Sequence, residues 1–424
     1  MIVGHGHKEG RLADTDVRRL LEKGLAKVPL DGRKVLALIP DSTRTAPVGL
    51  MFRTLCDLLR ERAERLDFLI ALGTHPPMTE AKILAMLGMD ADERAERYGD
   101  AEIFNHAWDN PDALATIGIL LADEMDRLTE GRYARDVPVQ LNRRLFDYDH
   151  LLIVGPTFPH EVVGFSGGHK YLFPGVAGPE IIHFFHWLGA LVTNWKINGV
   201  KDTVTRRVID RAVEEVDLPI TSIDMVVTRR GLKGLYIGDP KKTFAAAADL
   251  SAQVHIRYAD RPFKRVLGIA PEMYDDLWTA GKVMYKLEPI VEDGGELVIY
   301  APHITEVSYT HGHVLDRIGY HCLDYFREQM DKFDGVPGGI MAHATHVKGL
   351  GTYCDGVERP RIRVTLATGI PRERCDRIGL GYLDPNDVRL AEWLGREKAG
   401  ILVVDHAGET LYRLASERQE QERT

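Results

Sequence analysis

Residues 150–170 read HLLIVGPTFPHEVVGFSGGHK, an apolar run followed at once by a loop rich in glycine and histidine. The apolar run is typical of a buried strand, because it is short and carries branched side chains. Earlier runs also end in polar loops, in ALIP–DSTRTAP, IALG–THPPMT and EIFNH–AWDN. In an open parallel sheet such loops gather at the carboxyl ends of the strands, where ligands bind. We therefore expect His75, His106 and His160 to converge on one crevice, although a structural histidine is the commoner explanation for each alone.

Strand-like and helix-like segments alternate along the chain, which is typical of helices packed on a mostly parallel sheet. The predicted strands are residues 34–40, 67–75, 102–106, 137–141, 150–156, 264–270, 296–302 and 362–368. The predicted helices are residues 48–66, a helix begun by PPMTEAK, and residues 179–192, 205–216, 240–259, 275–287 and 313–330.

The pattern restarts after ADRPFK, at residues 259–264, and this restart indicates a domain boundary. We expect two α/β domains, residues 1–255 and 262–395, with mostly parallel sheets and an active-site cleft between them. The tail, residues 396–424, could complete the first domain or add a strand to the second.

Composition excludes several classes of protein. Among 424 residues, 54 Lys and Arg oppose 63 Asp and Glu, so the net charge is −9. That charge argues against a nucleic-acid binder and against attachment to an anionic membrane. The apolar runs are too short to span a bilayer, and the first residues do not have the pattern of a signal peptide. Four cysteines lie far apart without a CxxC pair, which is typical of a cytoplasmic protein.

The segment GFSGGHK places three glycines close to Lys170. Glycines allow a backbone to approach a ligand closely, and a lysine beside them favours a phosphate site. The segment matches neither the P-loop nor the GxGxxG pattern. A tight turn without a ligand stays an open alternative.

Residues Glu180, His183 and His186 are spaced by three on a predicted helix. This spacing places the side chains on one face, where they could hold a metal ion. A solvated or core-facing stripe is the alternative.

Taken together, these segments make the chain resemble the nickel-dependent lactate racemase family, the 2-hydroxyacid racemases and epimerases that use a pincer nucleotide. The shared pattern around the loop consists of His160, Gly164 to Gly168, Lys170, Pro174–Gly175 and His186. Elsewhere the matching residues are Asp41, Thr43, Arg44, Gly73 to His75, Asn105–His106, Asp276, Leu277, Ala280 and Lys282. The resemblance runs in order through most of the chain.

The resemblance implies a role for each matching position. Lys170 would carry the cofactor, nickel pyridinium-3,5-bisthiocarboxylic acid mononucleotide (the nickel-pincer nucleotide), through a thioamide bond, and His186 would bind its nickel. His106 and His160 would form the acid/base pair, and Lys282 would face the active site. The residues expected to hold the cofactor phosphate are Asp41, Thr43, Arg44, Ser166, Gly167 and Gly168. Separate maturation proteins would supply the cofactor.

These residue types suit inversion of a 2-hydroxy acid. The hydrogen on C2 is weakly acidic, and a histidine with an ordinary pKa of roughly 6.5 does not readily remove it as a proton. Removing it as hydride avoids a carbanion but needs an electrophilic cofactor. The two enantiomers direct their hydroxyl groups differently, so one histidine per enantiomer is expected.

The chain departs from the lactate enzymes of the family in the expected substrate shell. Pro76 stands where those enzymes have an arginine for the substrate carboxylate, and Thr279 stands where they have a glutamine. A bidentate fork for a carboxylate is therefore lost. We expect a 2-hydroxy acid other than lactate, with Trp278 as a wall of its site and His75 as a polar contact or a turn cap.

Two alternatives belong to other classes. A metal-dependent hydrolase or lyase would use Glu180, His183 and His186 without a pincer cofactor. A non-catalytic nucleotide-binding homologue would keep the fold but not the catalytic residues, all of which are present here.

Overall fold

The computed structural model describes residues 2–417, and the chain divides into two compact units. The first unit consists of Met1–Phe158, Phe165–Ile182 and Lys201–Val254. The second unit consists of Pro159–Gly164, His183–Val200 and His255–Thr424. His160 and His186 thus belong to the second unit, although they precede the predicted boundary in the sequence. The last crossing, after Val254, lies next to that boundary.

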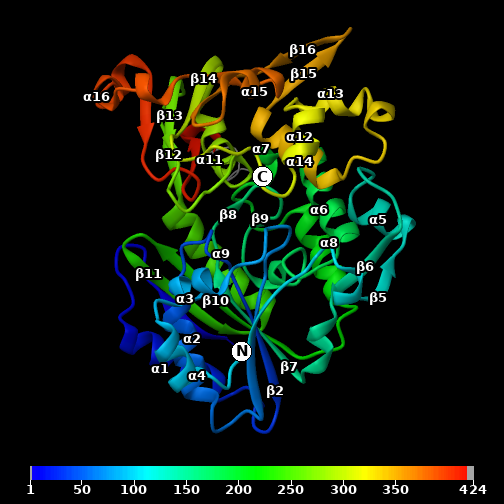
Figure 1. Cartoon of the computed structure of the whole chain (residues 1–424), viewed down its shortest axis with the longest axis vertical. Helices are drawn as coiled ribbons and strands as arrows, with labels where there is room; N and C mark the ends of the chain where they lie inside the picture. Colours follow the sequence, from blue (N-terminus) through cyan, green and yellow to red (C-terminus); the bar gives the residue numbers. More distant parts are fainter. Residues whose placement is uncertain (1, 418–424) are drawn as a thin grey trace. The chain divides into compact units, whose positions relative to one another are not determined.

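The first unit is built on a seven-stranded sheet (Figure 1). In sheet order its strands are β1 (Ile2–Gly6), β11 (Gly231–Gly238), β10 (Ile220–Thr228), β7 (His150–Pro156), β2 (Lys34–Ile39), β3 (Arg65–Ile70) and β4 (Ile103–Asn105). All pairs from β10 to β4 are parallel, whereas β11 is antiparallel to β10 and to β1. The predicted α/β class with mostly parallel sheets is confirmed.

Helices cover this sheet because its strands are apolar on both faces. Every residue of β7 is buried, and only Lys34 of β2 is exposed. The helix α1 (Asp14–Leu25) packs against β11 and α2 (Val48–Leu59) (Figure 1). The remaining helices that lie wholly in this unit, apart from short 3-10 turns, are α3 (Glu80–Leu87), α4 (Ala91–Tyr98), α5 (Ala122–Leu128) and α8 (Val204–Val213). The helix α9 (Pro240–His255) ends at the last crossing.

Three differences from the expected elements matter for the site. The predicted strand 137–141 exists as β6 (Val137–Asn142), but it pairs only with β5 (Leu114–Leu120) in a separate antiparallel hairpin. The strands β10 and β11 were not predicted, yet β10 lies between β7 and β11 in the sheet. The helix begun by PPMTEAK starts later than its prolines, because the Thr79 hydroxyl caps it by accepting the Lys82 N–H.

The second unit contains a five-stranded sheet in which all pairs are parallel. In sheet order its strands are β18 (Gly381–Tyr382), β17 (Arg363–Thr368), β14 (Val291–Ala301), β13 (Phe263–Ile269) and β19 (Ile401–Val404). Its shorter strand pairs include β12 (Ile256–Ala259) with β20 (Leu411–Leu414), and β15 (Gly351–Cys354) with β16 (Val357–Pro360).

The tail completes the second unit and not the first. The strand β19 forms the edge of the five-stranded sheet beside β13, and β20 pairs with β12. Each of these two strands pairs in parallel with a neighbour whose backbone N–H and C=O groups on that side would otherwise be unpaired. Residues 418–424 of the predicted tail segment lie outside the described residues.

Glycine interrupts one predicted helix of the second unit. The segment 313–330 forms α12 (Gly312–Ile318) and α13 (Leu323–Arg327), with Gly319 between them at a φ of +72°. The other helices of this unit are α7 (Asn194–Ile197), α10 (Leu277–Ala280), α11 (Lys282–Leu287), α14 (Gly338–Lys348), α15 (Arg372–Arg377) and α16 (Leu390–Trp393). The helix α6 (Pro179–Val192), which has the predicted bounds, begins in the first unit and ends in the second. Within residues 2–417 no helix has both the length and the hydropathy to cross a bilayer.

Substitution of Arg413 tests the assignment of the tail to the second unit. Its Nη2 donates to the carbonyls of Trp195 at 2.9 Å and Asn198 at 2.6 Å, and its side chain is 4% exposed. Arg413→Met should lower the free energy of unfolding by about 2 to 3 kcal/mol, because two buried carbonyls lose their donor. Arg389→Met is the matched control, since that side chain is 78% exposed, and it should change stability by less than about 0.5 kcal/mol. Denaturant unfolding followed by circular dichroism measures both, and equal effects would contradict the assignment.

Candidate functional site

The glycine-rich loop of the first unit is held by the buried carboxylate of Asp224, on β10. The Gly168 N–H donates to Asp224 Oδ1 at 2.8 Å, and the Thr157 hydroxyl lies 3.4 Å from the same oxygen. Gly167 has a φ of +91°, and a Cβ there would lie 2.2 Å from Thr157 Oγ1 and 2.8 Å from Asp224 Oδ1. Only glycine fits this close approach. Asp224 is thus a site residue that the sequence reasoning missed, although a charged residue inside the apolar run ITSIDMVVT was a signal.

Lys170 follows on a short 3-10 helix, η3 (Gly168–Tyr171). Among residues 162–178 it alone is partly exposed, and all the others are buried. Packing therefore fixes the backbone on both sides of Lys170, the one partly exposed residue of this stretch. Ser166, predicted to bind the phosphate, instead ties the loop together: its hydroxyl donates to the Pro156 carbonyl at 2.8 Å and accepts the Phe158 N–H at 3.0 Å.

Asp41, Thr43 and Arg44 follow β2 and form one compact turn. The Thr43 hydroxyl donates to Asp41 Oδ1 at 2.7 Å, and Arg44 Nη1 donates to Thr43 Oγ1 at 3.2 Å. Burial alone would raise the pKa of the Asp41 carboxyl, but His75, Arg44 and Thr43 together hold that pKa well below its ordinary value. An ionised carboxylate does not attract a phosphate, so of the three residues Arg44 is the one suited to an anion.

His75, from the loop after β3, pairs with Asp41. The distance from His75 Nδ1 to Asp41 Oδ2 is 2.5 Å, and the imidazole is 19% exposed. A carboxylate at Nδ1 orients the ring and leaves Nε2 for a ligand. Pro76 is exposed and offers no polar group at the position of the missing arginine.

His106, expected to be a base, is 2% exposed with both ring nitrogens engaged. Its Nε2 lies 2.9 Å from the Ala177 carbonyl oxygen, and its Nδ1 lies 3.0 Å from Asn142 Nδ2. These partners suit a neutral ring that donates from Nε2 and accepts at Nδ1. Burial lowers the pKa of His106 to about 4, against the opposing effects of Ala177 and Asp109. The geometry favours a structural role for this histidine.

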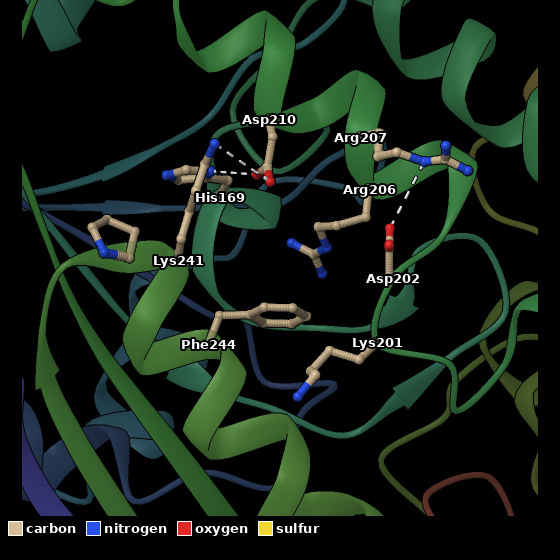
Figure 2. A pocket seen from close by; sticks show the side chains of 9 residues that line it. His169, Lys201, Asp202, Arg206, Arg207, Asp210, Lys241 and Phe244 are labelled. Carbon is tan, nitrogen blue, oxygen red and sulfur yellow. Dashed lines mark hydrogen bonds and ion pairs between the residues drawn. The ribbon is translucent and has the colours of Figure 1, made fainter. Parts of the chain in front are cut away.

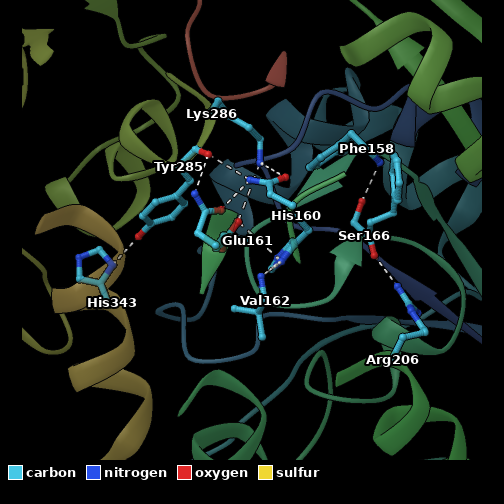
Figure 3. Close-up of polar contacts among 12 residues, drawn as sticks. Phe158, His160, Glu161, Val162, Ser166, Arg206, Tyr285, Lys286 and His343 are labelled. Carbon is cyan, nitrogen blue, oxygen red and sulfur yellow. Dashed lines mark hydrogen bonds and ion pairs between the residues drawn. The ribbon is translucent and has the colours of Figure 1, made fainter. Parts of the chain in front are cut away.

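His160, in the second unit, is also paired with a carboxylate. Its Nδ1 lies 3.6 Å from Glu161 Oε2 and accepts the Val162 N–H at 3.2 Å. Glu161 in turn lies 4.0 Å from the ammonium of Lys286, which is 1% exposed (Figure 3). Burial would raise the pKa of Glu161, but His160 and Lys286 keep that pKa far below its ordinary value. Neither Glu161 nor Lys286 was predicted, and only the adjacency of Glu161 to His160 signalled a role.

The predicted cluster of Glu180, His183 and His186 does not form. Glu180 is turned to Arg135, with which it makes an ion pair. His183 and His186 are partly exposed on α6. Their neighbours on this helix, residues 184–185 and 187–190, are buried. No group of three or more His, Cys, Asp or Glu side chains within residues 2–417 could hold a metal ion. The prediction of this cluster, on which the hydrolase alternative depends, is therefore wrong.

The remaining predicted residues lie on and around α10 and α11. The Asp276 carboxylate caps α10 by accepting the Thr279 N–H and hydroxyl, both at 2.9 Å, so Thr279 is committed within its own helix. Trp278 stacks on His343 of α14 with ring centroids 4.2 Å apart. The Lys282 ammonium lies 4.6 Å from the centroid of the Tyr274 ring.

The helix α14 brings two histidines that the sequence reasoning did not single out. His343 Nδ1 lies 2.8 Å from the Tyr285 hydroxyl, as Figure 3 shows, and burial holds the pKa of His343 well below its ordinary value. His346 is 6% exposed, and its Nε2 has no hydrogen-bond partner among the described residues. The short repeat HATH was the only local signal for them.

Comparisons with known proteins agree with these observations. A family model described as the lactate racemase N-terminal domain matches residues 15–197. The lactate racemase of Thermoanaerobacterium thermosaccharolyticum is 23% identical over 329 residues, which cover 75% of this chain and 70% of that protein.

Solved structures share the fold. A crystal structure of a Thermotoga maritima protein matches with a TM-score of 0.89 and 32% identity, covering 97% of this chain and 100% of that chain. The lactate racemase apoprotein of T. thermosaccharolyticum matches with a TM-score of 0.71 and 16% identity, again covering 97% of this chain and 100% of that one. These matches, together with the ordered set of loop, lysine and histidines, support a racemase-type function, and the chain belongs to the lactate racemase-like family.

Proposed function

We propose that this protein is a racemase or epimerase that inverts C2 of a 2-hydroxy acid other than lactate, with a nickel-pincer nucleotide attached to Lys170. The proposal is supported by two histidines that lie beside carboxylates: His75 Nδ1 is 2.5 Å from Asp41 Oδ2, and His160 Nδ1, which accepts a backbone N–H, is 3.6 Å from Glu161 Oε2. A racemase needs two acid/base groups of matched chemistry, because each enantiomer presents its hydroxyl in its own direction.

The residues present fit the proposed cofactor. Lys170 is the one accessible amine in a buried stretch, and Gly167 leaves no room for a side chain beside it. His186 is partly exposed and offers an imidazole, a ligand type that suits nickel, with the sulfur donors supplied by the cofactor. When bound, the cofactor would supply an acceptor for the hydride of C2, which no side chain can provide.

The chain's own groups handle the proton. A neutral imidazole takes the proton of the substrate hydroxyl, and its carboxylate partner stabilises the imidazolium that results. The second imidazole would return a proton to the oxygen of the planar 2-keto acid, to whose other face the bound cofactor would supply the hydride. Because both nitrogens of His106 are engaged, we propose His75 rather than His106 as the partner of His160.

Cations balance the negative charge of the substrate and cofactor. Arg44 is proposed to bind the cofactor phosphate. Lys282 is proposed to bind the substrate carboxylate, because position 76 is a proline and not an arginine. Trp278, stacked on His343, provides an aromatic wall. Cofactor maturation proteins as partners and a cytoplasmic location belong to the same proposal.

Variants of Lys170 and His186 test the cofactor. Lys170→Ala should abolish both the mass increment on the protein and the activity, because the covalent bond cannot form. His186→Ala should lose nickel but keep the mass increment, because the thioamide tether does not need the imidazole. Intact-mass spectrometry and metal analysis of protein made in a cofactor-producing cell measure both. Lys242→Ala, an exposed control outside the site, should keep both properties; full nickel and activity in the two test variants would refute the cofactor.

Variants of the three histidines test the acid/base assignment. His75→Gln and His160→Gln should each lower racemisation roughly 10²- to 10⁴-fold, the worth of one positioned acid/base. In single turnovers each variant should still form keto acid from one enantiomer, and the two should prefer opposite enantiomers. His106→Gln should reduce thermal stability more than it reduces turnover per folded molecule. If His106→Gln instead shows the selective half-reaction and His75→Gln does not, His106 is the base.

The substrate class is tested with a panel of single-enantiomer 2-hydroxy acids and chiral analysis of the products. Lactate should be a poor substrate compared with acids bearing larger or more polar side chains, because position 76 is a proline and offers no guanidinium for the carboxylate. Pro76→Arg should raise the relative rate with lactate. Lactate as the best substrate would refute the specificity but not the mechanism, whereas no inversion of any acid by verified nickel-loaded protein would refute the function.

A further inference from the structure

The first unit contains a basic pocket that the proposed reaction does not use. Its volume is about 170 Å³, and it lies among the glycine-rich loop, α8 and the start of α9. Four permanent cations line it, Lys201, Arg206, Arg207 and Lys241, against two carboxylates, Asp202 and Asp210. This excess of positive charge occurs on a chain whose net charge is −9.

Most of these cations already have carboxylate partners. Lys201 pairs with Asp249 at 2.6 Å, Arg207 with Glu130 at 2.8 Å, and Lys241 with Asp210 at 3.8 Å. These pairs lie at or near the surface, where an ion pair contributes little and exchanges easily. They can therefore turn toward a ligand at small cost.

Arg206 is different, because it is 5% exposed and its hydrogen bonds go to carbonyl oxygens. It donates to the Gly167 carbonyl at 3.2 Å and to the Phe165 carbonyl, and its Nε has no hydrogen-bond partner within residues 2–417. A guanidinium has five N–H donors, so these two bonds leave most of them unused. Burial lowers the pKa of Arg206 to about 10, with Asp210 and Asp224 opposing the shift, so the group is charged at neutral pH.

Phe244 holds the guanidinium in place. The Arg206 Cζ lies 4.0 Å from the centroid of the Phe244 ring, a stacked cation–π contact. Figure 2 shows Arg206 over this ring, with Asp210 facing His169 and Lys241 on one side and Asp202 facing Arg207 on the other. The stacked plane is fixed before any ligand arrives, which reduces the entropic cost of binding.

We propose that this pocket binds a small phosphate-type anion, either inorganic phosphate or the terminal phosphate of a small metabolite. A buried, fixed guanidinium surrounded by further cations matches the geometry and charge of a phosphate. The volume is below the roughly 300 Å³ of ordinary ligand sites, so the pocket suits a small anion or the terminal group of a larger molecule. The anion would give the Arg206 guanidinium a charged hydrogen-bond partner, since its hydrogen bonds within the chain go to carbonyl oxygens.

The bound anion also acts on the loop that carries Lys170. Arg206 holds the Gly167 carbonyl, and His169, the chain neighbour of Lys170, has its Nδ1 2.7 Å from Asp210. Phe244 Cβ lies 3.0 Å from where a Cβ of Gly168 would be. An anion paired with Arg206 and Lys241 would therefore stabilise the loop through the Gly167 carbonyl and Asp210, in addition to the hydrogen bond from the Gly168 N–H to Asp224.

The test is calorimetric titration of the full-length protein with inorganic phosphate at constant ionic strength, and with glycerol 3-phosphate as the second ligand. Lys241→Gln should weaken binding about two- to fivefold, as expected for a surface charge. Its matched control is Lys242→Gln, the next residue on α9, which does not line the pocket and should bind like the wild type. Arg206→Met should weaken binding tenfold or more, because a charge-assisted bond is lost. Tighter binding of glycerol 3-phosphate identifies a metabolite, and equal binding identifies free phosphate.

Several results would overturn the proposal. The proposal is wrong if neither ligand binds the wild type saturably, or if the two lysine variants have equal effects on binding. Loss of binding in Arg44→Gln, with Lys241→Gln unchanged, would place the phosphate at the proposed cofactor site instead. If Arg206→Met does not fold, the double variant Lys201→Gln with Lys241→Gln replaces it, since both side chains are about half exposed. The readout is phosphate binding, so its failure is distinct from a failure of the proposed racemase activity.

Discussion

The close approach of Gly167 to Thr157 and Asp224 is the constraint on which the candidate site depends. A side chain at position 167 would collide with both groups, so the loop can lie against β10 only because the residue is glycine. The buried Asp224 carboxylate then holds the Gly168 N–H. Lys170 follows directly, in a stretch whose other residues are buried. The loop is fixed before a cofactor binds, as precise positioning requires.

The histidines show how a partner decides the use of an imidazole. A carboxylate at Nδ1, as in His75 with Asp41, fixes the orientation of the ring and leaves the other nitrogen outside that contact. An amide and a carbonyl, as around His106, hold one neutral tautomer and use both nitrogens. Both residues follow strands of the same sheet. Their surroundings, and not their residue type or their position at a strand end, separate an acid/base group from a structural one.

Buried charge is arranged differently in the two units. In the second unit Glu161 lies between His160 and Lys286, so a buried cation and a carboxylate compensate each other beside the imidazole. In the first unit Arg206 has carbonyl oxygens as partners and an aromatic ring beneath it. A buried cation paired with a carboxylate is already neutralised, whereas a buried cation bonded only to carbonyl oxygens favours an anionic ligand.

The local pattern of the chain by itself determined the α/β class, the bounds of the helix over 179–192, and the loops that follow β2, β3 and β7. Periodicity, glycine sterics and strand ends are properties of neighbouring residues, so they can be read without a structure. Tertiary structure alone decided that β10 lies inside the sheet, that the tail joins β13, and which groups the imidazoles contact. Asp41 is 34 residues from His75, while Ala177 is 71 residues from His106. Such partners are chosen by the pairing of distant strands and loops, and no local pattern encodes that choice.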